Sequence, residues 1–243
     1  MGVLSLKREN IVAFLPFYLL VIILFIGVAA GGSRAVTTIA ENQPVPRTVT
    51  FVIDAGHGGI DGGATSCTGV LESQLNLEVS LRLNDLMQLL GYRTVMVRTT
   101  DTSVHTSGGS IAQIKLSDLK ERVRIVNETE NGILVSIHQN TFTDSRYAGA
   151  QVFYAGEGSR GLAEKLQAQL VQVLIPTSRR QCKPAKGIYL MEKIDRPGLL
   201  IECGFLSNPG EEALLRSPTY QKKLTCVIAA SICGYTLDAQ TND

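Results

Sequence analysis

Two kinds of hydrophobic pattern alternate along the chain. Short runs of apolar and β-branched residues predict strands at 48–54, 93–98, 132–138, 150–154, 187–191 and 198–202. Between them, apolar residues recur every three or four positions, as at Leu75, Val79 and Leu83, which predicts amphipathic helices. Strands that alternate with helices indicate an α/β fold: a single three-layer domain with a mostly parallel central sheet and helices on both faces.

Helix-start signals refine this pattern in the second half of the chain. Ser117 is predicted to cap a helix after a polar loop that runs to about Leu116. Asn208-Pro209 and Ser217-Pro218 are each typical of an N-cap followed by the first helical position. Residues 175–186 are predicted to form a basic loop.

One segment, residues 11–30, does not fit the alternation, because 18 of its 20 residues are apolar. A helix of that length reaches about 30 Å, the thickness of the hydrocarbon core of a bilayer. Lys7 and Arg8 precede it, so the positive-inside tendency places the rest of the chain outside the cytoplasm. The small residues 28–30 also suit signal-peptide cleavage. Residues 1–30 are therefore predicted to be a signal peptide or, by preference, a membrane anchor formed by an N-terminal hydrophobic helix.

Composition divides the remaining chain and excludes some classes of protein. Residues 31–47 have the small, polar, Pro-containing composition of a linker, 48–238 are predicted to be the folded domain, and 239–243 a tail. The formal net charge of the 243 residues is only +1, which argues against a nucleic-acid partner. Five cysteines, an odd number, argue against a disulfide framework.

Polar residues stand where three predicted strands end. His57 follows the first strand, His138 closes the 132–138 strand and Glu202 closes the 198–202 strand, so all three could share one edge of a parallel sheet. With Glu72 from the start of the first helix, the two histidines could hold Zn²⁺ and leave a position open for water. Glu202 would then be free to transfer a proton. The alternative reading makes each histidine a loop residue bonded to backbone and Glu72 a charge favoured by the helix dipole.

Two other chemistries start from neighbouring residues. The glycine-rich segment 55–63 follows a strand, as in a nucleotide site, but it matches neither the dinucleotide-binding nor the P-loop pattern. Cys203 with His138 could form the Cys/His pair of a thiol hydrolase. Cys203 lies in an apolar run, however, and this favours a buried, inert thiol.

Four motifs in order carry a resemblance. They are DAGHGG at 54–59, a glutamate opening the next helix at Glu72, SIHQN at 136–140 and ECGFLSN at 202–208. On these motifs, about residues 49–237 resemble the zinc-dependent N-acetylmuramoyl-L-alanine amidases. Ala55 stands where that family usually has proline, and Cys203 where an apolar residue or threonine is common; neither departure removes a metal ligand.

The resemblance implies a reaction and its residues. Zn²⁺ would be held by His57, Glu72 and His138, with Glu202 as the catalytic carboxylate, to cleave the amide between N-acetylmuramic acid and L-alanine. The 187–202 segment and the overall layout look most like the germination-specific spore cortex amidases, which implies a role in muramic lactam formation and germination. The alternatives are the thiol hydrolase and a non-catalytic, membrane-anchored wall-binding protein.

The same resemblance implies the partners and the location. The substrate would be peptidoglycan, that is, glycan strands with stem peptides. The enzyme would meet it outside the cytoplasmic membrane, which residues 11–30 would span. An activating protein partner is possible. Arg179 and Arg180, in a basic cluster with Lys183 and Lys186, could position the carboxylates of the stem peptide, or could equally be solvated loop residues. Asn140 is a further candidate for substrate binding.

Overall fold

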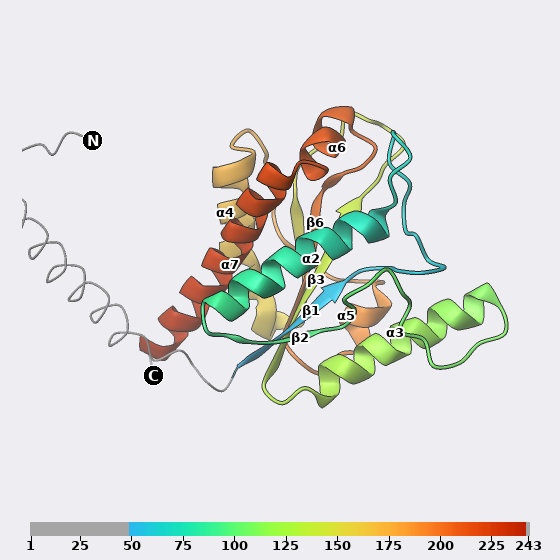
Figure 1. Cartoon of the computed structure of the whole chain (residues 1–243). Helices are drawn as coiled ribbons and strands as arrows, with labels where there is room; N and C mark the ends of the chain where they lie inside the picture. The colour runs from blue at the N-terminus through green and yellow to red at the C-terminus, as the bar shows by residue number, and fades with distance from the viewer. Residues whose placement is uncertain (1–48, 242–243) are drawn as a thin grey trace, which may run out of the picture. The chain divides into compact units, whose positions relative to one another are not determined.

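The computed structural model describes residues 49–241, and the side chains of residues 49–235. These residues form a mixed α/β domain built on a six-stranded sheet (Figure 1). The strand order is β2-β1-β3-β6-β4-β5. The strands are β1 (Thr50–Ala55), β2 (Arg93–Met96), β3 (Gly132–Asn140), β4 (Gln151–Ala155), β5 (Lys183–Pro184) and β6 (Gly198–Phe205). All neighbouring strands pair in parallel except β4 and β6, which are antiparallel. The predicted mostly parallel sheet is thereby confirmed.

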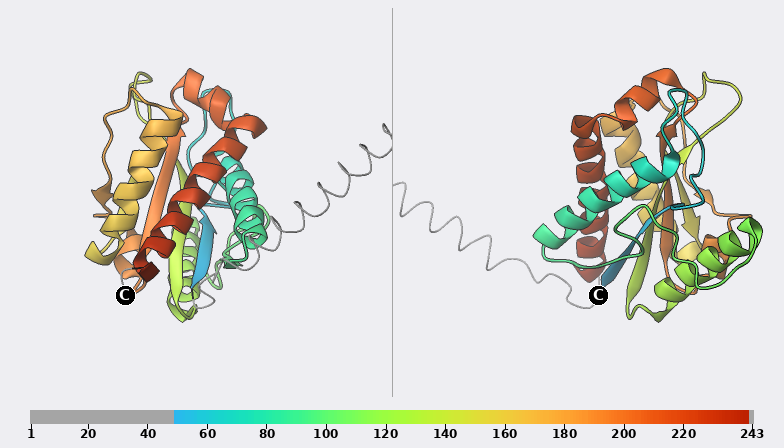
Figure 2. Two further views of the ribbon diagram at one scale, coloured as in Figure 1. Left: turned by 90° about the vertical axis from the view of Figure 1, so that its left-hand side faces the viewer. Right: turned by 45° about the vertical axis from the view of Figure 1, so that its right-hand side comes forward.

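Helices cover both faces of this sheet. They are α2 (Glu72–Leu89), α3 (Ile111–Glu128), α4 (Arg160–Leu174), α5 (Tyr189–Lys193), α6 (Pro209–Leu215) and α7 (Pro218–Thr241), with a short 3-10 turn η1 (Glu157–Ser159). Helices α2, α4 and α7 lie side by side on one face, and α3 and α5 lie on the other (Figure 2). The described residues therefore form the three layers that the alternating pattern predicts.

The core follows from the strand composition. Central strands β3 and β6 are flanked by strands on both sides and covered by helices on both faces, so they are built from near-continuous apolar runs. Leu134, Ile137 and Ile201 have no exposed surface. On α7, Leu224, Ile228 and Ile232 are likewise fully buried. This packing fixes the carboxyl ends of β1, β3 and β6 next to one another, and those ends carry the candidate chemistry.

Two predicted elements are wrong. Residues 187–191 do not form a strand: Gly187 has a left-handed φ of +76°, and the chain then turns into the short helix α5. The adjacent residues Leu190 and Met191 of this helix are both buried. Ser117 caps no helix, because α3 already begins at Ile111 behind Ser110, whose side chain forms a capping box with Gln113. The predicted polar loop therefore ends about six residues earlier than expected.

Other boundaries agree with the sequence to within a few residues. Asn208 caps α6, with Pro209 in its first turn, and α7 begins at Pro218 as predicted. The basic segment 175–186 is a loop apart from the two-residue strand β5. All five cysteines are free thiols, in agreement with the prediction of no disulfide framework.

The predicted anchor or signal segment at 1–30 and the linker at 31–47 lie outside the described residues. Between residues 49 and 241, no helix has the length and apolar content needed to cross a bilayer. The predictions for the amino-terminal segment therefore stay predictions.

Candidate active site

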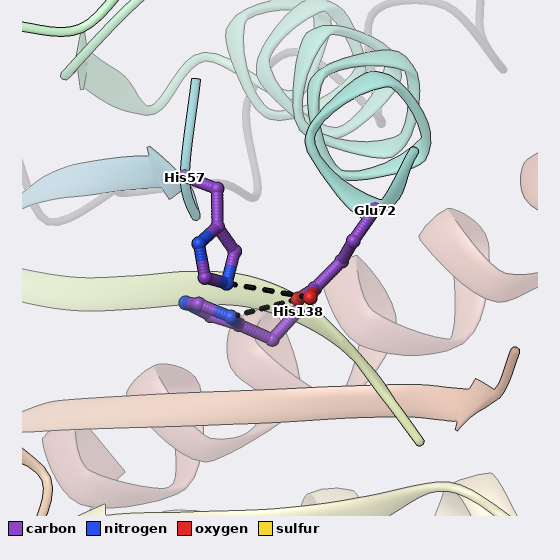
Figure 3. Close-up of side chains that lie close together, drawn as sticks. All are labelled: His57, Glu72 and His138. Atoms are coloured by element: carbon purple, nitrogen blue, oxygen red, sulfur yellow. Dashed lines mark hydrogen bonds and ion pairs between the residues drawn. The ribbon is translucent and has the colours of Figure 1, made fainter. Parts of the chain in front are cut away.

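Three side chains from distant parts of the chain converge at the carboxyl edge of the sheet (Figure 3). His57 follows β1, Glu72 opens α2 and His138 lies near the end of β3. His57 Nε2 lies 3.3 Å from Glu72 Oε2, and His138 Nδ1 lies 3.1 Å from Glu72 Oε1. One ligand atom from each residue lies within 4.8 Å of the others, so the group could hold a metal ion. The structure thus brings together the predicted His, Glu, His set.

The backbone around His57 is arranged for this contact. His57 has a φ of +61°, an uncommon conformation for a residue with a side chain, within a tight turn in which the amide of Gly58 donates to the carbonyl of Asp61. The ring atom Nδ1 lies 2.9 Å from Asp61 Oδ2, and Lys115 Nζ donates to the other oxygen of Asp61 at 2.7 Å. Because Nδ1–H donates to this carboxylate, Nε2 is left facing Glu72, as in the carboxylate-supported histidines of metal sites.

Glu72 is held in place by several donors. Its carboxylate accepts hydrogen bonds from the amides of Ala64 and Gln139 and from Asn76, one helical turn later. The side chain is almost completely buried. Burial acts to raise the pKa of Glu72, but the hydrogen bonds and charges of the two histidines outweigh burial and hold the pKa far below its usual range.

His57 responds to the same charge. Burial acts to lower the pKa of His57, but the carboxylates of Glu72 and Asp61 outweigh it and raise the pKa to about 9. The cluster therefore favours positive charge between the imidazoles and Glu72, which either a proton or a metal cation can supply. Both imidazoles are partly exposed, 26% and 19%, so the site is open to solvent on one side.

Glycines allow the ligands to approach so closely. A Cβ on Gly56 would lie 2.2 Å from His138 Nε2, and one on Gly63 would lie 2.6 Å from Glu72 Oε2. Gly63 also has a φ of +68°. Side chains at either position would occupy the space in which the ligands lie, so the glycine-rich segment serves the His, Glu, His cluster.

Two buried arginines fix the loop that carries His57. Arg98 donates to the carbonyls of Ala55, Gly56 and Ser73, and so joins the end of β1 to the first turn of α2. Arg122 pairs with buried Asp54 and donates to the carbonyls of Ala55 and His57. The positions of His57 and Glu72 are thereby tied to one another through the backbone.

Glu202 lies beside the cluster. It is directly opposite His138 in the parallel pairing of β3 and β6. Its Oε2 is buried and has no hydrogen-bond partner in the described part of the chain. Burial raises the pKa of Glu202 to about 7, with Glu72 adding to the rise and the histidines opposing it. An unpartnered carboxylate that titrates near neutral pH is suited to accept and return a proton.

The alternative chemistries find no support in this geometry. Cys203 is fully buried, and burial raises the pKa of its thiol well above its usual range, so it is a poor nucleophile. The glycine-rich segment faces the carboxylates of Asp61 and Glu72, which would repel a phosphate.

The three predicted substrate-binding residues differ in burial and in their contacts. Arg180 is half-buried, with its guanidinium 4.6 Å from the centre of the Phe205 ring, whereas the Arg179 side chain is exposed. Asn140 ends β3 and is half-buried, and its carbonyl accepts from the amide of Leu206. No described contact tests a role in binding for these three residues.

Sequence reasoning missed the residues that support the ligands. Asn76 stands four residues after Glu72 and Asp61 four residues after His57, and these spacings could have suggested both contacts. No local signal points to Arg98, whose partners are backbone carbonyls. Arg122 stands four residues after Asp118, with which it pairs, but its contacts with Asp54 and with the carbonyl of His57 join distant segments.

Comparisons with known proteins agree with this site. Residues 51–234 match the Amidase_3 family, described as N-acetylmuramoyl-L-alanine amidase. The germination-specific N-acetylmuramoyl-L-alanine amidase of Bacillus subtilis is 39% identical over 186 residues, which cover 75% of this chain and 78% of that protein.

Solved structures agree as well. The CwlD amidase of Clostridioides difficile, solved in complex with the GerS lipoprotein, is 37% identical with a TM-score of 0.74, and the match covers 77% of this chain and 98% of that one. An N-acetylmuramoyl-L-alanine amidase from Clostridium difficile 630 is 30% identical with a TM-score of 0.67, covering 78% and 97%. The chain therefore belongs to the N-acetylmuramoyl-L-alanine amidase family and is a cell wall hydrolase of that class.

Proposed function

We propose that the enzyme uses Zn²⁺ held by His57, Glu72 and His138 to hydrolyse the amide between N-acetylmuramic acid and the L-alanine of the stem peptide. The observation that carries this proposal is the convergence of two imidazole nitrogens and one carboxylate oxygen within 4.8 Å. Two histidines and a glutamate are a donor set that suits catalytic zinc, and the partly exposed imidazoles leave room for water and substrate.

The charge of the site supports a cation in that place. His57 Nδ1 lies 2.9 Å from Asp61 Oδ2, and His57 Nε2 lies 3.3 Å from Glu72 Oε2. Two carboxylates around one imidazole favour a positive charge there, which a metal cation can supply in place of a proton. When bound, Zn²⁺ supplies Lewis acidity that polarises a carbonyl and acidifies water.

Glu202 supplies the proton transfer in this proposal. Its buried Oε2 is free to accept a proton from the attacking water and to return it to the amine nitrogen of the leaving L-alanine. Its place opposite His138 puts the carboxylate beside the metal ligands without making it one of them. Asp61, Asn76, Arg98 and Arg122 hold the ligands in position.

The test separates metal binding from proton transfer. Glu202→Gln keeps the size of the side chain but removes its ability to carry a proton, so we expect bound zinc to stay at one per chain and peptide release from purified sacculi to fall about 10²–10⁴-fold. Glu130→Gln is the matched control, because Glu130 is exposed and precedes β3 at the opposite end of that strand. Release at the wild-type rate by Glu202→Gln would refute the assignment of Glu202.

We further infer that the natural substrate is the spore cortex, reached from the outer side of the membrane with residues 11–30 as anchor or export signal. The similarity to the germination-specific Bacillus amidase supports this role. The lipoprotein complex of the Clostridioides relative supports the idea that a protein partner assists this enzyme too. Spores that lack the enzyme should contain no muramic lactam, and an unchanged lactam content would contradict the cortex role.

A further inference from the structure

An open hollow of about 630 Å³ lies between the loop that follows β3 and the basic loop 175–186. This volume is within the range of small-ligand sites. Its lining includes four cationic side chains and no acidic one. The lining residues that matter here are Arg146, Tyr147, Gln151, Arg179, Arg180 and Lys183. We call this set the basic hollow; Lys186, the fourth member of the predicted basic cluster, does not line it.

Gln151 connects the basic hollow to the candidate active site. It is the direct partner of Glu202 in the antiparallel pairing of β4 and β6, so both side chains point to the same face of the sheet. The Cβ atoms of such partners are about 5 Å apart. Gln151 is also almost fully buried. The basic hollow is therefore one cross-strand neighbour away from the carboxylate that transfers the proton in the proposed function.

The cations of the hollow differ in how they are held. Arg180 is fixed in place: it donates to Gln151 Oε1 at 2.8 Å and to the carbonyl of Ala148 at 2.7 Å, and it stacks on Phe205. Arg146 is paired with Asp144. The side chains of Arg179 and Lys183 are exposed, and neither has an ion pair in the part of the chain that the structure describes. The positive charge of Arg180 is therefore fixed at one end of the hollow, and the charges of Arg179 and Lys183 at the other end are not neutralised by an ion pair among the described residues.

We propose that the basic hollow binds a carboxylate of the stem peptide, on the peptide side of the scissile amide. This inference rests on the proposed function, since the peptide leaves from the side of Glu202. An arginine fork matches the geometry of a carboxylate. The exposed ring of Tyr147, tilted by 59° against Phe142 with 4.6 Å between ring centres, offers an apolar wall for alanine methyl groups.

The experiment measures binding rather than turnover. The full chain carrying Glu202→Gln is titrated by calorimetry with an N-acetylmuramoyl-L-alanyl peptide whose terminal carboxyl is free or amidated. We expect the free acid to bind about tenfold more tightly, the effect of one charge-assisted contact. Adding Arg179→Gln with Lys183→Gln should reduce this ratio to about one. Both side chains are exposed, so the variant should fold normally.

A charge-matched variant provides the control. Lys120→Gln with Lys193→Gln removes two exposed charges from α3 and α5, on the other face of the sheet, and should keep the tenfold ratio. Equal affinity of the starting protein for the two peptides would overturn the proposal, as would a ratio that survives loss of Arg179 and Lys183. Failure of the proposed function would instead appear as absence of bound zinc or as peptide release by Glu202→Gln at the wild-type rate, and either result would leave the binding ratio unaffected.

Discussion

Gly56→Ala should disable the site by adding one methyl group. The new Cβ would lie 2.2 Å from Nε2, 2.3 Å from Cε1 and 2.7 Å from Cδ2 of His138. Ordinary contact begins at 3.4 Å, so the ring or the end of β1 must move by about 1.2 Å. Gly56 does not have a left-handed φ, and the substitution therefore acts through this overlap and not through backbone strain.

The expected magnitude follows from that displacement. Catalytic groups must be held to within about 0.5 Å, and a misplacement of about 1 Å can reduce the rate about 100-fold. We therefore expect Gly56→Ala to lose at least about 100-fold in peptide release, together with weaker zinc retention during dialysis against a chelator. Overpacking of this kind destabilises a fold by about 1–3 kcal/mol, so the variant should still be folded at 25 °C.

Gly158→Ala is the matched control, because a Cβ there meets nothing within 4 Å and its φ is also ordinary. The assays are peptide release from sacculi, zinc per chain and thermal unfolding. Near wild-type release by Gly56→Ala would show that His138 does not need its observed position, and the reasoning from close approach would fail. Equal losses of peptide release in Gly56→Ala and Gly158→Ala would likewise contradict the reasoning, because Gly158→Ala causes no overlap.

Three further predictions concern the residues around the site. Arg98→Met leaves the carbonyls that Arg98 now satisfies without a donor and should lower the free energy of unfolding by about 2–5 kcal/mol in urea titrations. An unchanged midpoint would show that these hydrogen bonds do not stabilise the fold. Cys203→Ala should retain peptide release, whereas chelation should abolish it, and the reverse pattern would establish thiol catalysis. For Asp54, burial acts to raise the pKa, but Arg122 and Ser136 outweigh it and lower the pKa below 3.8. Asp54 therefore contributes stability above pH 3.8 that is lost as the pH falls through its folded pKa, so Asp54→Asn should be clearly less stable than wild type at pH 7 and the difference should shrink below pH 3.8. A difference that is constant with pH in denaturant unfolding would contradict this.

The sequence alone determined the layers of the domain and the identity of the candidate metal ligands. Apolar periodicity indicated most strands and helices, because a buried strand and an amphipathic helix leave different local patterns. His57, His138 and Glu202 could be placed at one edge because parallel strands end on the same side of a sheet. The composition of residues 11–30 separately predicts an anchor or export signal.

Local pattern was insufficient where an apolar run was short. Residues 187–191 were predicted to form a strand, because a short apolar run has the length of a buried strand. The left-handed Gly187 instead turns the chain into the short helix α5. Strand β6 already pairs with β3 and β4, so no place beside it in the sheet was left for another strand. Tertiary packing therefore decided the form of α5.

Only the tertiary structure decided how the site is supported. Arg98 and Arg122 contact backbone carbonyls of distant segments, Gly56 is required by a ring more than eighty residues away, and the basic hollow joins two loops through Gln151. These contacts depend on distances between segments that fold together, and no local periodicity records such distances. The sequence thus determined which groups could carry out the chemistry, and long-range packing decided their positions.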